Sequence, residues 1–166
     1  YMLVGSFSSS YYGVARSTKD VDLVVQLGDR SISEVDHALG PRFKLDRQMS
    51  FETITGTTKH VFAVEETTFQ VEVFRLSDDL HDQERFRRRQ RVKFQGHDTW
   101  LPTAEDVILT KLVWSSTGNR PKDADDVRNV IAVQGDAIDW DYVHRWCDEH
   151  GTRNLLDEIR ASVPPI

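Results

Sequence analysis

The sequence predicts an α+β fold in which a mixed β-sheet flanked by helices is followed by a C-terminal helical segment. Strand-type runs, apolar or rich in Val, Thr and Phe, lie within the first 76 residues, whereas the chain after Pro102 reads as helices. The length of 166 residues fits one domain, because domains commonly have roughly 100 to 200 residues. We therefore expect a core formed by 1–100 and a helical segment, 101–166, packed on it as one compact unit.

Strand patterns account for the sheet. Residues 1–4 are apolar and read as a short buried strand, and 20–25 alternate before turning fully apolar, as a strand entering a core does. Segments 60–65 and 68–76 follow the turn signal at Gly56 and read as a hairpin or meander. A natural protein of this type is expected to carry further residues, such as a helix, ahead of the first strand.

Two connecting segments have their own signals. Residues 5–13 are rich in small side chains and read as a loop whose backbone can approach another group closely. Residues 31–39 read as a short helix, because Ser31 and Glu34 have capping-box spacing and Gly40-Pro41 ends the pattern.

The second half of the chain reads as four helices. Thr103 can cap the first, which we expect to run to about residue 115, and the Gly118–Pro121 segment interrupts the pattern. The remaining helices are expected at 122–133, 140–150 and 153–162, with Trp114, Trp140 and Trp146 in their core and Cys147 buried beside them.

Composition excludes several classes of protein. The charged fraction of 29% and the lack of an apolar run of about 18 residues exclude a membrane span. The net charge of −6 disfavours a protein that coats nucleic acid. The single cysteine cannot form an internal disulfide, and the histidines have no metal-ligand spacing, so a reducing, cytoplasmic setting is expected.

One segment departs from this acidic average. Residues 84–93 hold six basic side chains against one acid, a local charge of +5 on a remainder of −11. The strip can bind a polynucleotide acceptor such as tRNA through its phosphates, or it can be a solvated helix face that compensates acidic neighbours. The candidate contacts are Arg85, Arg87, Arg88, Arg89 and Arg91.

The chemistry is concentrated in three acids and one small-residue pair. Thirteen residues separate the Gly5-Ser6 pair from Asp20. Asp20 and Asp22 are two apart on a strand, so their side chains point to one face. Glu72 lies in the middle of a later strand among apolar neighbours. Three converging carboxylates would raise each other's pKa, which argues for a bound cation, and Mg²⁺ prefers such oxygen ligands together with phosphate and water.

This pattern resembles the nucleotidyltransferase superfamily built on the DNA polymerase beta palm, in which an apolar residue and Gly-Ser precede Asp-x-Asp. The text Leu3-Val4-Gly5-Ser6 and Tyr12–Val25 is similar to small stand-alone bacterial members, including abortive-infection toxins. The resemblance continues through Pro102–Asp106, Lys111, Arg120–Asp123 and Asp126, and it covers most of the chain.

The resemblance implies a role for each residue of the front half. Gly5 and Ser6 are expected to hold the β- and γ-phosphates of a nucleoside triphosphate. Asp20 and Asp22 are expected to bridge two Mg²⁺ ions, with Mn²⁺ as a substitute. Glu72 is expected to hold the metal nearer the attacking hydroxyl or to act as its general base, although the family more often has aspartate there.

The helical segment adds basic residues. On the 105–115 helix, Lys111 falls inside the apolar arc, with Asp106 and Thr110 on the polar side, so it needs an anionic partner. We expect Lys111 or Lys122 to contact the triphosphate, with Asp123 orienting one of them. Arg16 is a further candidate. The alternatives are snorkelling for Lys111, a surface salt bridge for Arg16, and helix-start charges with i, i+4 pairing for Lys122, Asp123 and Asp126.

The expected reaction is transfer of a nucleoside monophosphate from a triphosphate to a hydroxyl, with release of pyrophosphate. The acceptor can be a tRNA end, a protein side chain or a small molecule such as an aminoglycoside, and a regulatory protein partner is compatible with the resemblance. The main alternative is an inactive nucleotide-binding or antitoxin-like module of the same fold. A kinase is less favoured because the chain has no Gly-x-x-x-x-Gly-Lys loop.

Overall fold

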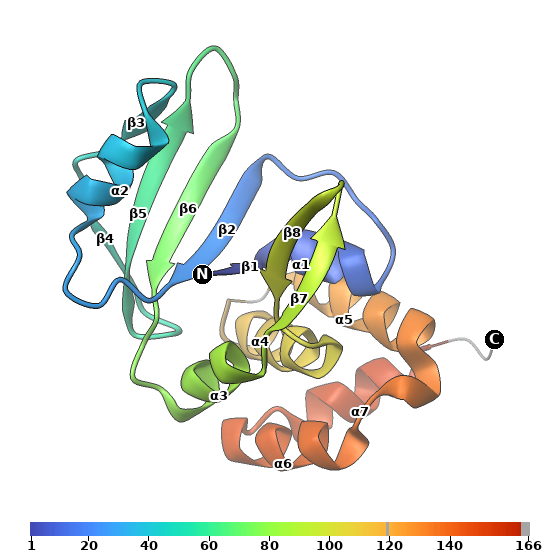
Figure 1. Ribbon diagram of the computed structural model, residues 1–166. Helices are drawn as coiled ribbons and strands as arrows, with labels where there is room; N and C mark the ends of the chain where they lie inside the picture. Colours follow the sequence, from blue (N-terminus) through green and yellow to red (C-terminus); the bar gives the residue numbers. More distant parts are fainter. Residues whose placement is uncertain (119, 164–166) are drawn as a thin grey trace.

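The computed structural model describes residues 1–118 and 120–163 (Figure 1). Its main sheet has the order β1-β2-β6-β5-β3, with β4 also paired to β5, and a separate hairpin is formed by β7 and β8. The strands of the sheet are β1 (Met2–Val4), β2 (Asp20–Val25), β3 (Phe43–Leu45), β4 (Ser50–Glu52), β5 (Thr57–Val64) and β6 (Gln70–Arg75), and the hairpin consists of β7 (Gln90–Phe94) and β8 (His97–Leu101).

Helices cover one end of this sheet and complete the molecule. Figure 1 shows the last four α-helices gathered beyond β1, while α2 lies beside β3 at the opposite end. The helices are α1 (Gly5–Tyr12), α2 (Ile32–Leu39), α3 (Leu80–Arg88), α4 (Ala104–Gly118), α5 (Pro121–Gln134), the 3₁₀ turn η1 (Gly135–Ala137), α6 (Trp140–His150) and α7 (Arg153–Ala161). The predicted α+β class is confirmed.

The sheet is mixed, as predicted, because β2 and β6 run parallel while β1 and β5 flank them antiparallel. A parallel pair needs a long crossover connection, which here contains α2 and β3 to β5. In the β2–β6 register Asp22 lies opposite Glu72. Two acids 50 residues apart in the chain therefore become neighbours through one pair of strands.

The expected loop over 5–13 is wrong, because all but its last residue form α1. Serine hydroxyls of this helix donate back to carbonyls one turn earlier, from Ser8 and Ser9 to Gly5, and so satisfy their own hydrogen bonding. Small side chains also let the helix approach α5, where the Cβ of any residue at Gly13 would lie 3.0 Å from the Val130 nitrogen. Close packing thus outweighs the weak helix propensity of serine.

The basic segment 84–93 is not one continuous element. It spans the end of α3 and most of β7, so the hairpin is a feature that the sequence analysis did not predict. Gln95 and Gly96 both have positive φ, 48° and 83°, which is the conformation of a tight two-residue turn matched to the twist of two strands. The helix and the hairpin place successive arginines on different surfaces.

The other predicted elements are confirmed with small shifts of boundary. Strands β5 and β6, which were predicted as a hairpin or meander, begin and end up to three residues from their predicted positions. Helix α4 continues to Gly118 rather than ending near residue 115. Helices α5, α6 and α7 match their predicted spans within one residue. The capping box of α2 is present, with Glu34 Oε1 accepting from the Ser31 backbone N–H at 3.1 Å. Asn119, part of the predicted break, lies outside the described residues.

Two apolar clusters hold the molecule together. The smaller one joins β1, β2, β6 and α3 through Met2, Val24, Phe74 and Phe86. The larger one fills the space among α4 to α7, includes Cys147 as expected, and takes in Tyr12 from α1. Tyr12 therefore ties the front half to the helices, and its hydroxyl donates to the Pro102 carbonyl at 2.8 Å.

Within the part of the chain that the structure describes, every helix is too short or too polar to cross a membrane.

The larger cluster predicts a large cost for truncation in α7. Leu156 is fully buried there, so Leu156→Ala should lower the free energy of unfolding by about 2–5 kcal/mol in a urea titration. Leu80→Ala is the matched control, because Leu80 is 78% exposed and the same substitution should cost less than about 0.5 kcal/mol. Equal losses in the two variants would contradict this account of the core.

Candidate active site

Three carboxylates from two adjacent strands line one pocket of about 670 Å³. Asp20 and Asp22 point to the same face of β2, and Glu72 joins them from β6, opposite Asp22. Asp20 is exposed, whereas Asp22 and Glu72 are half-buried. The arrangement places oxygen donors at the end of the sheet that faces the helices.

Asp22 lies in an environment that disfavours its charged form. Among the described residues its carboxylate forms no hydrogen bond or ion pair, and burial followed by the negative charges of Glu72 and Asp20 raises its pKa to about 6. The charge of Lys111 opposes this rise. Asp22 therefore lies in a region of strong negative potential that a cation would relieve.

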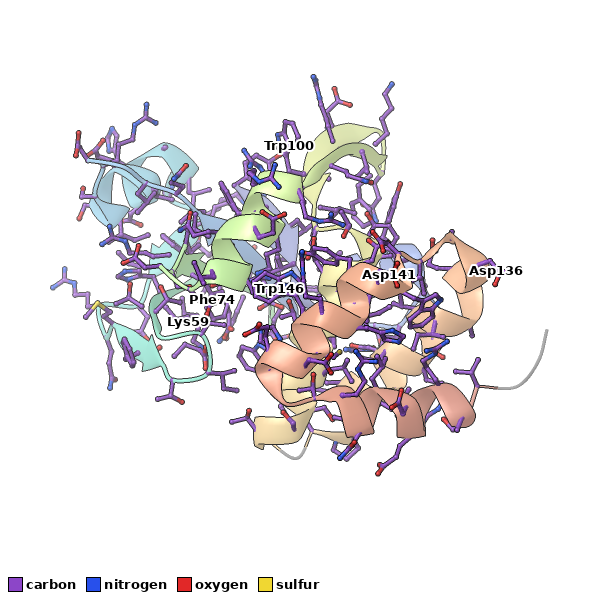
Figure 2. All side chains as sticks on the ribbon, turned by 90° about the horizontal axis from the view of Figure 1, so that it is seen from below. Lys59, Phe74, Trp100, Asp136, Asp141 and Trp146 are labelled. Atoms are coloured by element: carbon purple, nitrogen blue, oxygen red, sulfur yellow. The ribbon has the colours of Figure 1, made fainter. Side chains whose placement is uncertain are left out.

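Lys59 is a site residue that the sequence analysis missed. It lies on β5, and its Nζ is 2.8 Å from Glu72 Oε1, across the strand pair. Figure 2 shows Lys59 beside Phe74, and the ammonium lies 5.9 Å from the centre of that ring. The available signal was the alternation of side chains along each strand. Lys59 pairs with Phe74, which lies two residues after Glu72, so the side chains of Lys59 and Glu72 are on the same face of the sheet and face the pocket.

Gly5 brings α1 directly against the carboxylates. Its φ is +65°, which favours glycine, and a Cβ at this position would overlap Asp22 Oδ2. The backbone N–H groups of the first helical turn have no partners within the helix and are suited to anionic groups. Only glycine therefore lets the helix start and the carboxylate share this end of the pocket.

Arg16 and Lys111 meet at one buried carboxylate. Asp126 accepts from Arg16 Nε at 2.7 Å and Nη2 at 2.8 Å, and its Oδ2 is also 2.8 Å from Lys111 Nζ. Arg16 Nη2 donates in addition to Ser6 Oγ at 2.9 Å. Burial alone would raise the pKa of Asp126, but hydrogen bonds from Arg16 and Lys111 outweigh it and lower that pKa.

A second carboxylate, Asp123, extends this network. It is 1% exposed and lies 2.7 Å from Lys111 Nζ through Oδ1 and 3.0 Å from Arg120 Nε through Oδ2. The three cations and two acids of the network carry a net charge of +1. The expectation that Lys111 needs an anionic partner is confirmed, whereas Lys122 is exposed at the edge of the pocket.

All nine predicted site residues line the same pocket, although they come from six segments of the chain. They are Gly5, Ser6, Arg16, Asp20, Asp22, Glu72, Lys111, Lys122 and Asp123. The sequence analysis offered only a helix-charge role for Asp126, but in the structure Asp126 binds both Arg16 and Lys111. The signal available for it was its i+3 spacing from Asp123, which puts both acids on one face of α5.

The expectation that Asp106 marks a polar face of its helix is wrong. Asp106 is fully buried, and its carboxylate accepts from Tyr142 at 2.7 Å and from Thr103 at 2.9 Å. Burial would raise its pKa, but hydrogen bonds from His81 and Tyr142 lower it. The two charged residues Asp106 and Lys111 of α4 are therefore buried and paired rather than solvated.

The arginine strip is paired internally with acids and aromatic rings. Arg85 is 4% exposed and ion-paired with Asp82, and Arg88 lies 3.8 Å from the centre of the Tyr142 ring. Further pairs join Arg87 to Glu84, Arg91 to Asp98, and Arg89 to the rings of Phe86 and Trp100. These contacts give the arginines structural roles, and a polynucleotide contact through them stays a prediction.

The chemistry of the donors is compatible with a magnesium ion. Within the described residues no three His, Cys, Asp or Glu side chains are disposed as a complete metal cage, and Glu72 is turned toward Lys59. Magnesium does not need such a cage, because it is commonly held by one or two carboxylates plus phosphate and water. Asp20 and Asp22, without ion pairs in the described part of the chain, fit that requirement.

Comparison with solved structures supports the fold. An antigenic nucleotidyltransferase-like protein from Paracoccidioides brasiliensis is similar with a TM-score of 0.51 and 15% identity, over 99% of this chain and 85% of that one. JHP933 from Helicobacter pylori is similar with a TM-score of 0.49 and 16% identity, over 93% of this chain and 68% of that one. At 15% identity, the likeness to the Paracoccidioides brasiliensis protein concerns the fold alone.

Sequence comparison gives the family. No curated protein matches the chain. A family described as "Nucleotidyltransferase of unknown function (DUF6036)" matches residues 1–162, nearly the whole chain. The pocket with its paired aspartates, the nucleotidyltransferase-like fold and this match agree, and the chain belongs to that nucleotidyltransferase family.

Proposed function

We propose that this protein transfers a nucleoside monophosphate from a nucleoside triphosphate to a hydroxyl acceptor and releases pyrophosphate. The observation that carries the proposal is one pocket that joins acidic and basic groups: Asp20, Asp22 and Glu72 lie at the sheet, and Arg16 and Lys111 lie beside the start of α1. The basic groups suit the anionic phosphates, and the acidic groups suit the hydroxyl that attacks and must lose its proton.

Each end of the pocket has its own task. The backbone N–H groups at the start of α1, the Ser6 hydroxyl and the two cations bound to Asp126 hold the triphosphate. The acceptor oxygen then forms a bond to the α-phosphorus, the bond from that phosphorus to the β-phosphate oxygen breaks, and the hydroxyl proton passes to Glu72. Lys59 fixes the position of Glu72 for this role.

Asp20 and Asp22 are the residues that would hold Mg²⁺, or Mn²⁺ in its place. When bound, the ion would neutralise charge on the reacting phosphate and on the departing pyrophosphate. Glu72 would complete the set on the side of the acceptor, as glutamate in place of the family's more frequent aspartate.

The acceptor and cellular setting are parts of the proposal that the pocket supports less directly. A tRNA end, a protein side chain and a small molecule all supply a hydroxyl, and the exposed Arg87 and Arg91 are the members of the strip most accessible to a polynucleotide. The single cysteine is buried and unpaired within the described residues, which fits a reducing, cytoplasmic compartment. A toxin-like role there is proposed from the family resemblance alone.

Transfer of label distinguishes the reactions. Protein incubated with an α-labelled triphosphate, Mg²⁺ and either total tRNA or cell extract should label an acceptor, and Asp20→Asn or Asp22→Asn should slow labelling by about 10³-fold or more. Asp29→Asn is the control, because Asp29 is exposed in the loop after β2. EDTA should also stop labelling.

Two results would contradict the proposal. Label transferred from the γ-phosphate instead would indicate a kinase, and triphosphate binding without any transfer would indicate the inactive nucleotide-binding module.

The raised pKa of Asp22 predicts a change of stability with pH. Because the folded pKa of about 6 exceeds the ordinary value of 3.8, the neutral acid stabilises the folded metal-free protein below about pH 4, and this contribution is lost as pH rises through 6. Asp22→Asn should therefore gain roughly 2–3 kcal/mol over the wild type between pH 4 and pH 8 in urea titrations with EDTA.

Added Mg²⁺ should reverse that difference at pH 8 by raising the melting temperature of the wild type more than that of Asp22→Asn. Parallel stability curves for the two proteins from pH 4 to pH 8 would show that Asp22 is not under strong negative potential.

Asp126 is predicted to matter for nucleotide affinity. Asp126→Asn removes the charge that holds Arg16 and Lys111 together, so the KM for the triphosphate should rise about 10-fold, equivalent to about 1.4 kcal/mol, with a smaller change in kcat. Asp125→Asn is the control, since the neighbouring Asp125 is 65% exposed and, among the residues that the structure describes, pairs only with Arg128. Equal KM values for both variants would remove Asp126 from this role.

A further inference from the structure

Trp114 is the pocket residue that the reaction chemistry leaves without a task. It lies on α4 one turn after Lys111, and both side chains line the 670 Å³ pocket. The sequence analysis expected Trp114 in the helical core, but the core cluster includes Trp140 and Trp146 as its packing partners and not Trp114. The indole is half-buried and faces the pocket instead.

Arg120 fixes the indole in place. Its guanidinium carbon lies 4.8 Å from the centre of the Trp114 ring, and its Nε is held by Asp123. The same carboxylate holds Lys111 through its other oxygen. One buried acid therefore sets the spacing between a phosphate-binding lysine and a flat pair formed by an indole and a guanidinium.

A second cavity of about 210 Å³ adjoins the pocket at Trp114. The two cavities share the walls formed by Thr55, Asp82, Thr110 and Trp114, so the indole stands at their junction. A flat group that stacks beside Trp114 would place its edge in this smaller space.

Four hydroxyls in the lining of the second cavity donate their protons to other groups of the protein. Thr110 donates its hydroxyl proton to the Asp106 carbonyl, and Ser116 and Thr117 donate theirs to the Val113 carbonyl. Thr55 donates to Glu52. These hydroxyls keep lone pairs but have no proton left to offer, so the lining suits a donor such as an amino group.

We infer that Trp114 and Arg120 bind the nucleobase of the triphosphate, and that the cavity beside them favours a base with an exocyclic amino group at its far edge, as in adenine. This inference rests on the proposed function, because Lys111 anchors the phosphates one helical turn away. Stacking of a base on an aromatic ring supplies affinity that tolerates any base, and the acceptor-lined cavity supplies the preference.

Binding measurements with three probes test the inference. Calorimetry with Mg²⁺ should show that Trp114→Ala weakens ATP binding about 10-fold or more and leaves the binding of inorganic tripolyphosphate unchanged. Wild-type protein should bind ATP about 10-fold more tightly than inosine triphosphate, in which an oxygen replaces the amino group.

Tryptophan fluorescence tests the same role without Trp114→Ala, the substitution that can disturb α4. ATP should quench the wild-type emission, Trp114→Phe should abolish the quenching while still binding ATP, and Trp140→Phe, changed far from the pocket, should keep it.

The failures are separable. Unchanged ATP affinity in Trp114→Ala, or equal weakening for ATP and tripolyphosphate, overturns the stacking role. Equal affinity of the wild type for ATP and inosine triphosphate overturns the preference for an amino group. Failure of the wild type to bind either ATP or tripolyphosphate overturns the proposed function itself.

Discussion

The architecture of the pocket depends on the contacts of one buried carboxylate, that of Asp126. It binds Arg16 from the segment between α1 and β2, and Lys111 from α4, while Ser9 of α1 donates to it at 3.2 Å. Four separate parts of the chain therefore meet at one side chain of α5. Removing a partner from such a group leaves a charge buried without compensation, which is far more costly than losing a surface pair. These contacts hold α1, α4 and α5 together at this side of the pocket.

The sheet supplies the opposite wall by a different principle. Parallel pairing of β2 and β6 brings Asp22 beside Glu72 through backbone register, and Gly5 allows α1 to begin against the same carboxylate. Acids are placed together by the backbone, despite their repulsion, whereas the cations are placed by their acidic partners. The pocket is thus polarised, with unneutralised negative charge at the sheet and a small excess of positive charge at the helices.

Local patterns predicted most of the fold, and together with the family resemblance they singled out nine residues that line one pocket, but they did not predict the contacts that tertiary packing alone creates. Alternation identified β2 and β6, and caps and breaks located α5, α6 and α7. Serine-rich α1 was missed because its hydroxyls bond to their own helix, and the β7–β8 hairpin was missed because six basic residues masked the alternation of Val92 and Phe94. The pairing of Lys59 and the burial of Asp106 and Asp126 depend on residues remote in the chain, and spacing along a strand or helix does not show these contacts.

The ion pair between Lys59 and Glu72 helps the sheet to assemble without the metal ion of the proposed function. A cluster of three acids would oppose the pairing of β2 with β6 during folding, but an ammonium group 2.8 Å from Glu72 offsets one of these charges from within the sheet. The chain carries its own counter-ion there, unlike small metal-dependent folds that remain unfolded until an ion arrives. On the proposed function, a metal ion would bind a protein that is already folded, and it would add to the stability of that fold rather than create it.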